Sequence, residues 1–183
     1  MTFVRRLARG VGMIEVLVAL VIIAVGLLGL AGAQLQAQKA EIESYQRTQA
    51  LLLLEDIASR IRANRTTAHC YETDSYVGHG ADPDDCAGWG TSATRALADR
   101  DMDDWDALLE GQAEMLDGDS VGAMTQARGC VTYDPTEEDF TVTVVWQGEV
   151  VTEEPASGCA AGEYGDDGLR RAVSTQLTIP DLD

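Results

Sequence analysis

The chain begins with a long run of apolar residues. From Val16 to Ala33 all eighteen residues are apolar or glycine. At about 1.5 Å per residue this run would form roughly 27 Å of helix, which is close to the apolar thickness of a lipid bilayer. The pattern therefore predicts a helix that can span a membrane.

After Ala33 the pattern becomes amphipathic, and nothing in it ends the helix. Residues 34–64 contain no glycine or proline and are dominated by strong helix formers. We expect one continuous helix from about Met13 to Arg65. Glu43 and Arg47 are spaced for an ion pair on one face. Another face carries the apolar residues expected to cover a sheet, namely Leu35, Ile42, Tyr45, Leu52, Leu53, Ile57 and Ile61.

The middle of the chain has weaker patterns. Residues 66–98 are rich in Thr, Gly, Asp, Ser and Pro, which predicts a loop. A helix is expected to begin near Asp101 or Asp103, with an aspartate as its N-terminal cap. Its core-facing residues would be Trp105, Leu108, Leu109 and Met115.

The last third alternates apolar residues with threonine, serine or glutamine. This alternation predicts strands at 129–133, 140–146 and 172–179. In hairpin order they would form an antiparallel sheet that packs on the amphipathic helix. The expected fold class is α+β, with a long N-terminal helix on a C-terminal antiparallel sheet.

One acid stands at the start of the apolar run. Glu15 directly precedes Val16, and the leader before it carries three arginines and no acid. An unpaired carboxylate costs about 2.5 to 3.5 kcal/mol at the membrane centre and less near its edge, so Glu15 requires a partner. The arginines place the N-terminus in the cytoplasm and the rest of the chain outside.

Cleavage between Gly10 and Val11 would supply such a partner. It would create an α-amino group on Val11 and make Glu15 the fifth residue of the mature chain, and the amine of a neighbouring copy could pair with that carboxylate. The basic leader, the glycine and this glutamate resemble the class III signal of type IV prepilins. The resemblance implies that a prepilin peptidase cleaves at Gly10 and Val11 and methylates Val11, and that Glu15 docks the subunit. Val11 departs from the Phe or Met that usually begins the mature chain.

Two other interpretations of the N-terminus stay open. Ala31-Gly32-Ala33 fits the cleavage pattern of a secretory signal peptide, which would leave Gln34 as the first residue. The apolar run is, however, longer than the usual 7 to 15 residues of such signals. An uncleaved signal anchor is the other alternative.

Four cysteines, an even number, follow the apolar run. Cysteines on the oxidising side of a membrane predict disulfides, and four of them allow three connectivities. Local loop closure favours pairing Cys70 with Cys86 and Cys130 with Cys159, each worth about 3 kcal/mol in the chain-entropy model. The alternative is a zinc site that adds His69 and His79 to the first pair. Its spacing fits no compact zinc finger, so we expect no metal.

The net charge of −18, from 31 acids and 13 bases, argues against nucleic acid as a partner. It favours a well-solvated exterior or basic partners. Asp99, Asp101, Asp103 and Glu110 occupy EF-hand positions one, three, five and twelve, but Asp104 replaces the turn glycine. No catalytic arrangement or cofactor motif is present, so a structural protein is expected rather than an enzyme.

Several blocks together resemble the PilV-type minor pilins of type IV pili. They are the runs 15–20 and 26–30, the helix around Trp105, the strand with Cys130, Trp146 at the end of a strand, and the late Cys159. The resemblance implies a subunit held in the bacterial inner membrane and then incorporated into an extracellular pilus. There it would join other minor pilins and the major pilin, prime assembly near the tip, and support twitching motility and adhesion.

The expected organisation has four parts. Residues 1–10 form the leader, 11–33 the transmembrane and filament-core helix, 34–65 its amphipathic continuation, and 66–183 a periplasmic or extracellular globular domain. A type II secretion pseudopilin shares the same signal and is one alternative. A membrane-anchored or secreted acidic binding module is an alternative of a different class.

Overall fold

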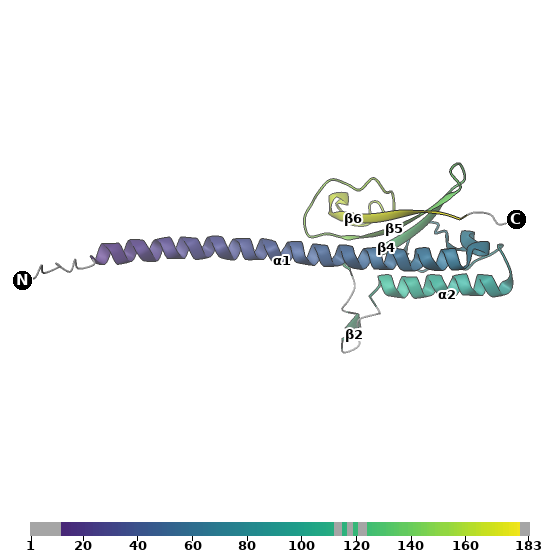
Figure 1. Ribbon diagram of the computed structural model, residues 1–183, viewed down its shortest axis with the longest axis horizontal. Helices are drawn as coiled ribbons and strands as arrows, with labels where there is room; N and C mark the ends of the chain where they lie inside the picture. Colours follow the sequence, from purple (N-terminus) through teal and green to yellow (C-terminus); the bar gives the residue numbers. More distant parts are fainter. Residues whose placement is uncertain (1–11, 112–114, 117–118, 121–123, 180–183) are drawn as a thin grey trace, which may run out of the picture. The chain divides into compact units, whose positions relative to one another are not determined.

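The computed structural model describes residues 12–111, 115–116, 119–120 and 124–179 (Figure 1). The helix α1 runs from Met13–Ala63 without interruption, which confirms the expected continuous helix. It ends two residues before the expected Arg65. Contacts divide the chain into two compact units, residues 1–42 and 43–183. The first unit consists, in its described part, of the N-terminal portion of α1, and every residue from Gly12 to Ile42 is exposed.

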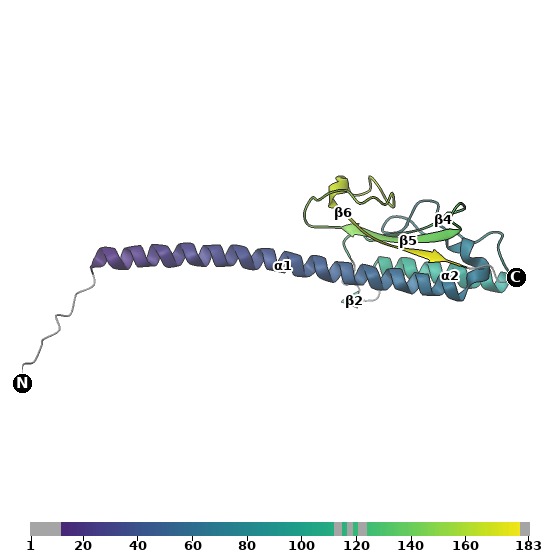
Figure 2. The same ribbon diagram turned by 45° about the horizontal axis from the view of Figure 1, so that its top comes forward.

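The second unit contains an antiparallel sheet. Its strand order is β1-β4-β5-β6, and each neighbouring pair is antiparallel. Figure 2 labels the three long strands. The bounds are Val77–Gly78 for β1, Arg128–Asp134 for β4, Asp139–Gln147 for β5 and Arg170–Thr178 for β6. The three long strands confirm the expected sheet and the α+β class, whereas β1 was not expected. A separate antiparallel pair joins β2 (Met115–Leu116) to β3 (Asp119–Ser120).

The second helix begins earlier than expected. The helix α2 spans Ser92–Leu109, so the expected start near Asp101 or Asp103 is wrong. Thr91 and Thr94 form a capping box, in which each side chain accepts a hydrogen bond from the other residue's backbone N–H. The expected loop 66–98 also contains the 3-10 helix η1 (Arg65–Tyr71). Of the residues expected to face the core, Trp105 and Leu109 are buried and Leu108 is half-buried.

The buried face of α1 differs from the expected one. Ile57 and Ile61 are buried as expected and Leu53 is partly buried, but Leu35, Ile42, Tyr45 and Leu52 are exposed. Two apolar stripes coexist on this helix, and the expected set combined residues from both. On α1, burial begins only in the part of the helix that belongs to the second unit. The buried residues of α1 are Gln46, Ala50, Leu54, Ile57, Ala58 and Ile61.

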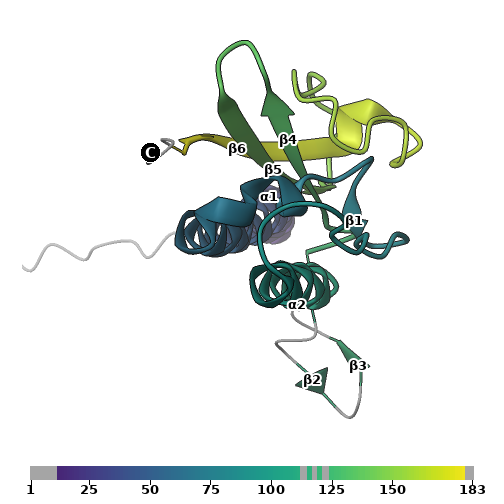
Figure 3. The same ribbon diagram turned by 90° about the vertical axis from the view of Figure 1, so that its right-hand side faces the viewer.

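Within the second unit, α1 and α2 lie side by side and run antiparallel (Figures 1 and 3). Trp105 Nε1 donates a hydrogen bond to the carbonyl oxygen of Leu53, at 3.0 Å. Both helices share one apolar cluster with a single face of the sheet, which includes Val131, Val142 and Val144. A smaller apolar cluster joins Val145 of β5 to Tyr164 of the loop 148–169, which contains η2 (Asp167–Leu169). Figure 2 shows this loop on the side of the sheet away from α1.

Candidate functional site

The N-terminal part of α1 combines one charge with a wholly apolar surface. Glu15 lies in the first turn, where its backbone N–H donates to the Gly12 carbonyl oxygen at 3.0 Å. A carboxylate at this position is stabilised by the helix dipole. The next charged residue along the helix is Lys39. The proposed processing residues Gly10 and Val11 lie outside the described residues.

The apolar side chains that follow Glu15 are uncovered by the chain itself. Ile22 is 66% exposed and Leu28 is 73% exposed. The most apolar 18-residue window of α1 has a mean hydropathy of 2.8, and none of it is buried. Water is an unfavourable environment for so large an apolar surface, so lipid or other apolar helices are expected around it.

Two disulfides tie the second unit together. Cys70 is bonded to Cys86 and Cys130 to Cys159, which is the connectivity favoured by local loop closure. A disulfide-bonded cysteine has no free thiolate with which to bind a metal ion. The alternative zinc site with His69 and His79 is therefore not formed in this structure.

The acidic run on α2 binds groups of the protein itself. Asp99 accepts a hydrogen bond from the backbone N–H of Cys86, at 2.8 Å. Asp106 accepts one from the backbone N–H of Gly78, at 2.7 Å. Because residues 99–109 are helical, the chain does not form the loop that an EF-hand requires. The pKa of Asp106 is raised, mainly because burial disfavours its charged form.

Asp101 is the centre of the link between α2, α1 and η1. Arg60 donates to its Oδ1 at 2.9 Å, and the Tyr71 hydroxyl donates to its Oδ2 at 2.6 Å. Burial lowers the pKa of Arg60, but its hydrogen bonds to Asp101 and Asp104 outweigh that effect and raise it. Burial and the bond to Asp101 raise the pKa of Tyr71. This buried network fixes α2 against α1.

Three arginines hold the loop 148–169 on the sheet. Arg128 is buried between the rings of Tyr76 and Tyr164, at 5.1 and 4.8 Å from their centroids. Arg170 donates to the carbonyl oxygens of Ser157 and Cys159. The loop is thus fixed by cation–π contacts and by charged hydrogen bonds to its backbone.

Arg171 joins the same loop to α1. It donates to Glu43 at 2.7 Å, to Thr152 Oγ1 at 2.8 Å and to the Gly168 carbonyl oxygen at 3.0 Å. The expected Glu43–Arg47 pair is therefore replaced by a long-range pair. None of these three arginines was predicted from the sequence as a contact residue. The one local signal was that each lies one or two residues before a predicted strand in so acidic a chain.

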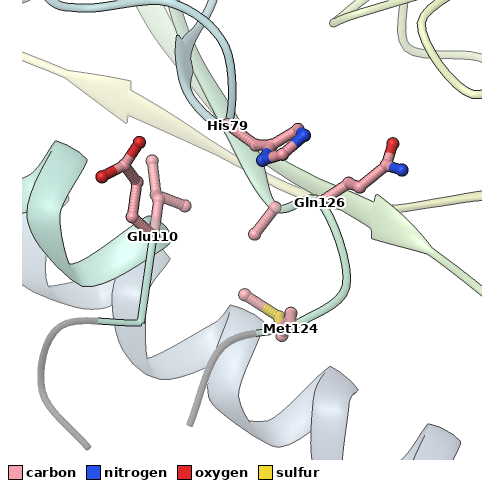
Figure 4. A pocket seen from close by; sticks show the side chains of 6 residues that line it. His79, Glu110, Met124 and Gln126 are labelled. Atoms are coloured by element: carbon pink, nitrogen blue, oxygen red, sulfur yellow. The ribbon is translucent and has the colours of Figure 1, made fainter. Parts of the chain in front are cut away.

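A small pocket of about 200 Å³ lies beside the end of α2 (Figure 4). The side chains of His79, Glu110, Met124 and Gln126 line it. Among the described residues that line it there is one imidazole and one carboxylate, but no serine, threonine or cysteine to act as a nucleophile. Within the described ranges, no group of three or more His, Cys, Asp and Glu side chains could hold a metal ion.

Comparison with known proteins gives two family matches, at adjacent segments. Residues 5–31 match the prokaryotic N-terminal methylation motif, and residues 32–103 match the family described as type IV pilin Tt1218. No curated protein and no solved structure matches the chain. The methylation motif and the apolar helix indicate membrane anchoring and assembly into a pilus. Together with the helix-and-sheet fold, the two matches make the chain similar to type IV pilins, a family of structural subunits and not of enzymes.

Proposed function

We propose that the chain is a minor pilin of the PilV type. A prepilin peptidase cleaves it between Gly10 and Val11 and methylates Val11. The mature subunit crosses the inner membrane once, with its N-terminus in the cytoplasm, and then enters a pilus near its tip. There it helps prime assembly with other minor pilins and the major pilin, and it supports twitching motility and adhesion.

The domain boundaries in this proposal follow the expected ones. Residues 1–10 are the leader, 11–33 the filament-core helix, 34–65 its amphipathic continuation and 66–183 the globular domain. The structure places the start of the second unit at Glu43, inside the amphipathic segment.

The single observation that carries the proposal is Glu15. It is the only charged residue of α1 before Lys39, it directly precedes the apolar run 16–33, and it follows a leader within the matched methylation motif. A carboxylate among apolar helices is stabilised by a cation, and cleavage supplies one in the new N-terminal amine of a neighbouring subunit.

The test replaces Glu15 by alanine in the producing bacterium. Mass spectrometry of the N-terminal peptide should still show methylated Val11. The amount of the variant in sheared pili should fall at least about tenfold, because breaking a buried ion pair costs about 3–5 kcal/mol. Glu41→Ala is the matched control, since Glu41 is an exposed acid of the same helix beyond the apolar run, and it should assemble normally.

Normal assembly of Glu15→Ala would contradict the docking role. A mature chain that begins at Gln34 or keeps Met1 would contradict prepilin processing. Deletion of the protein also distinguishes a type IV pilus subunit from a type II secretion pseudopilin. Loss of pili with intact secretion is expected, and the reverse phenotype would identify a type II secretion pseudopilin. The family description, type IV pilin, favours the pilus.

A further inference from the structure

A second pocket lies where the β4–β5 hairpin meets η1 and the loop before α2. Its volume is about 390 Å³. Four aromatic residues line it, His69 from η1, Trp89 from the loop, Tyr133 from β4 and Phe140 from β5. We call it the aromatic pocket. It plays no part in the proposed docking of α1, so it is independent of the proposed function.

The other three rings pack around His69. Its centroid is 4.4 Å from that of Trp89 in a stacked arrangement, and 4.6 Å from that of Tyr133 in an edge arrangement. Phe140 is 5.2 Å from His69 and 4.9 Å from Tyr133. The pocket is therefore lined by a contiguous group of aromatic rings, a residue type whose faces attract cations.

Trp89 is held in place although 53% of it is exposed. Gly88 and Gly90 on either side have φ values of 138° and 61°, which residues with a side chain rarely adopt. A Cβ at Gly90 would lie 2.1 Å from Thr67 Cγ2, so this backbone packs closely on η1. The Cys70–Cys86 disulfide ties the same loop to η1. The backbone on either side of this exposed tryptophan is thus fixed against η1, so its side chain is preorganised for contact with a ligand.

The charge around the rings is negative. Glu137 and Glu138, from the hairpin turn, line the pocket together with one base, Arg65. His69 already contacts a further carboxylate, that of Glu72, at 2.5 Å. Carboxylates beside aromatic rings attract a cation, and the net charge of −18 also attracts cations from a longer distance.

We propose that the aromatic pocket binds an alkylammonium group. The aromatic rings contact its apolar and positive surface, and the carboxylates of Glu137 and Glu138 balance its charge. Such a group occurs both in choline-type headgroups and in lysine side chains of proteins. The pocket would therefore give this acidic subunit a specific contact with one of these two sources.

The test is a titration of the purified full-length protein with choline and with Nα-acetyl-lysine amide at constant ionic strength. A polyoxyethylene ether detergent is used, because it carries neither choline nor sugar. Tryptophan fluorescence reports on Trp89, since Trp105 and Trp146 are buried. Saturable changes are expected, and the tighter ligand identifies the source. The neutral choline isostere 3,3-dimethylbutanol should bind about fivefold or more weakly, which is the size of a cation–π contribution.

Variants separate the pocket from general charge attraction. Glu137→Gln with Glu138→Gln should weaken choline binding about fivefold. The control is Glu153→Gln with Glu154→Gln, an exposed pair of acids away from the pocket, and it should leave binding unchanged. Trp89→Leu removes the reporter, so its loss of binding is measured by saturation-transfer NMR on the choline methyl protons.

Three results would overturn the proposal. Equal binding of the neutral isostere would show a merely apolar pocket. Equal weakening by the control pair would show non-specific attraction of cations. Binding of N-acetylglucosamine without binding of either ammonium ligand would show a carbohydrate site.

Discussion

A missing side chain lets Trp105 reach the sheet. A Cβ at Gly129 would lie 2.2 Å from Cη2 of Trp105, and the whole ring is buried. The indole is also fixed at its other end by the hydrogen bond to Leu53. It therefore cannot retreat from a larger residue in β4 without losing that bond.

Gly129→Ala should lower the free energy of unfolding by about 1–3 kcal/mol, as expected for an overpacked core. Denaturation with guanidinium in detergent measures this. Gly158→Ala is the matched control, because no atom lies within 4 Å of a Cβ built there, and it should change stability little. Equal stability of both variants would contradict the close packing of Trp105 on β4.

Tyr71 makes the stability depend on alkaline pH. Burial and the bond to Asp101 raise its pKa above the usual value near 10, so the folded protein holds this proton more tightly than the unfolded chain. Its stabilising contribution is complete below about pH 10 and is lost as the pH rises above that value.

Tyr71→Phe should therefore flatten the fall in stability between about pH 10 and 12. At neutral pH it should cost about 1–3 kcal/mol, because Oδ2 of Asp101 loses its hydrogen bond while Oδ1 keeps Arg60. Burial raises the pKa of Tyr164 as well, so part of the fall should persist. Tyr45→Phe, at an exposed position, is the control and should keep the wild-type slope. Unfolding curves at several pH values decide the matter, and identical slopes for wild type and Tyr71→Phe would exclude this role.

At the scale of elements, the loop 148–169 depends on Arg171. Besides the bonds to Glu43, Thr152 and Gly168, this side chain donates to the Val150 carbonyl oxygen. Gly148 makes room for it, since a Cβ there would lie 2.8 Å from the guanidinium carbon. One residue thus joins the loop, β6 and the helix α1.

Arg171→Ala should free the loop and lower the free energy of unfolding by about 1–3 kcal/mol, because several charged hydrogen bonds are lost. Digestion with a glutamate-specific protease should then cut faster at Glu149, Glu153 and Glu154, as measured by mass spectrometry. Glu43→Gln keeps an oxygen acceptor and should change the cutting rate much less. Unchanged digestion of Arg171→Ala would show that the loop is held by other contacts.

Elements with a strong local period were predicted from sequence. The continuous helix, the three long strands and the cysteine pairing all follow from residues near one another in the chain. The start of α2 was missed because its capping box pairs Thr91 with Thr94 and lacks the usual Glu or Gln. The arginines were missed because their partners are mostly backbone carbonyls, and Glu43 lies 128 residues from Arg171. No local pattern encodes such a contact.

At the scale of the whole molecule, the chain separates a folded unit from an uncovered helix. The first half-buried residue of α1 is Glu43 and the first buried one is Gln46, while every residue from Gly12 to Ile42 is exposed. The N-terminal portion of α1 therefore contributes little to burial in the described fold. Its sequence must be constrained by lipid or by other chains.

This division predicts how the two units vary in evolution. Positions from Glu43 onward should co-vary with residues of the same chain, as Glu43 and Arg171 must do to keep their pair. Positions before Glu43 have no such partners within the described fold. Substitutions there should instead be matched by changes in other proteins. The two parts of one continuous helix should therefore co-vary with different sets of partners.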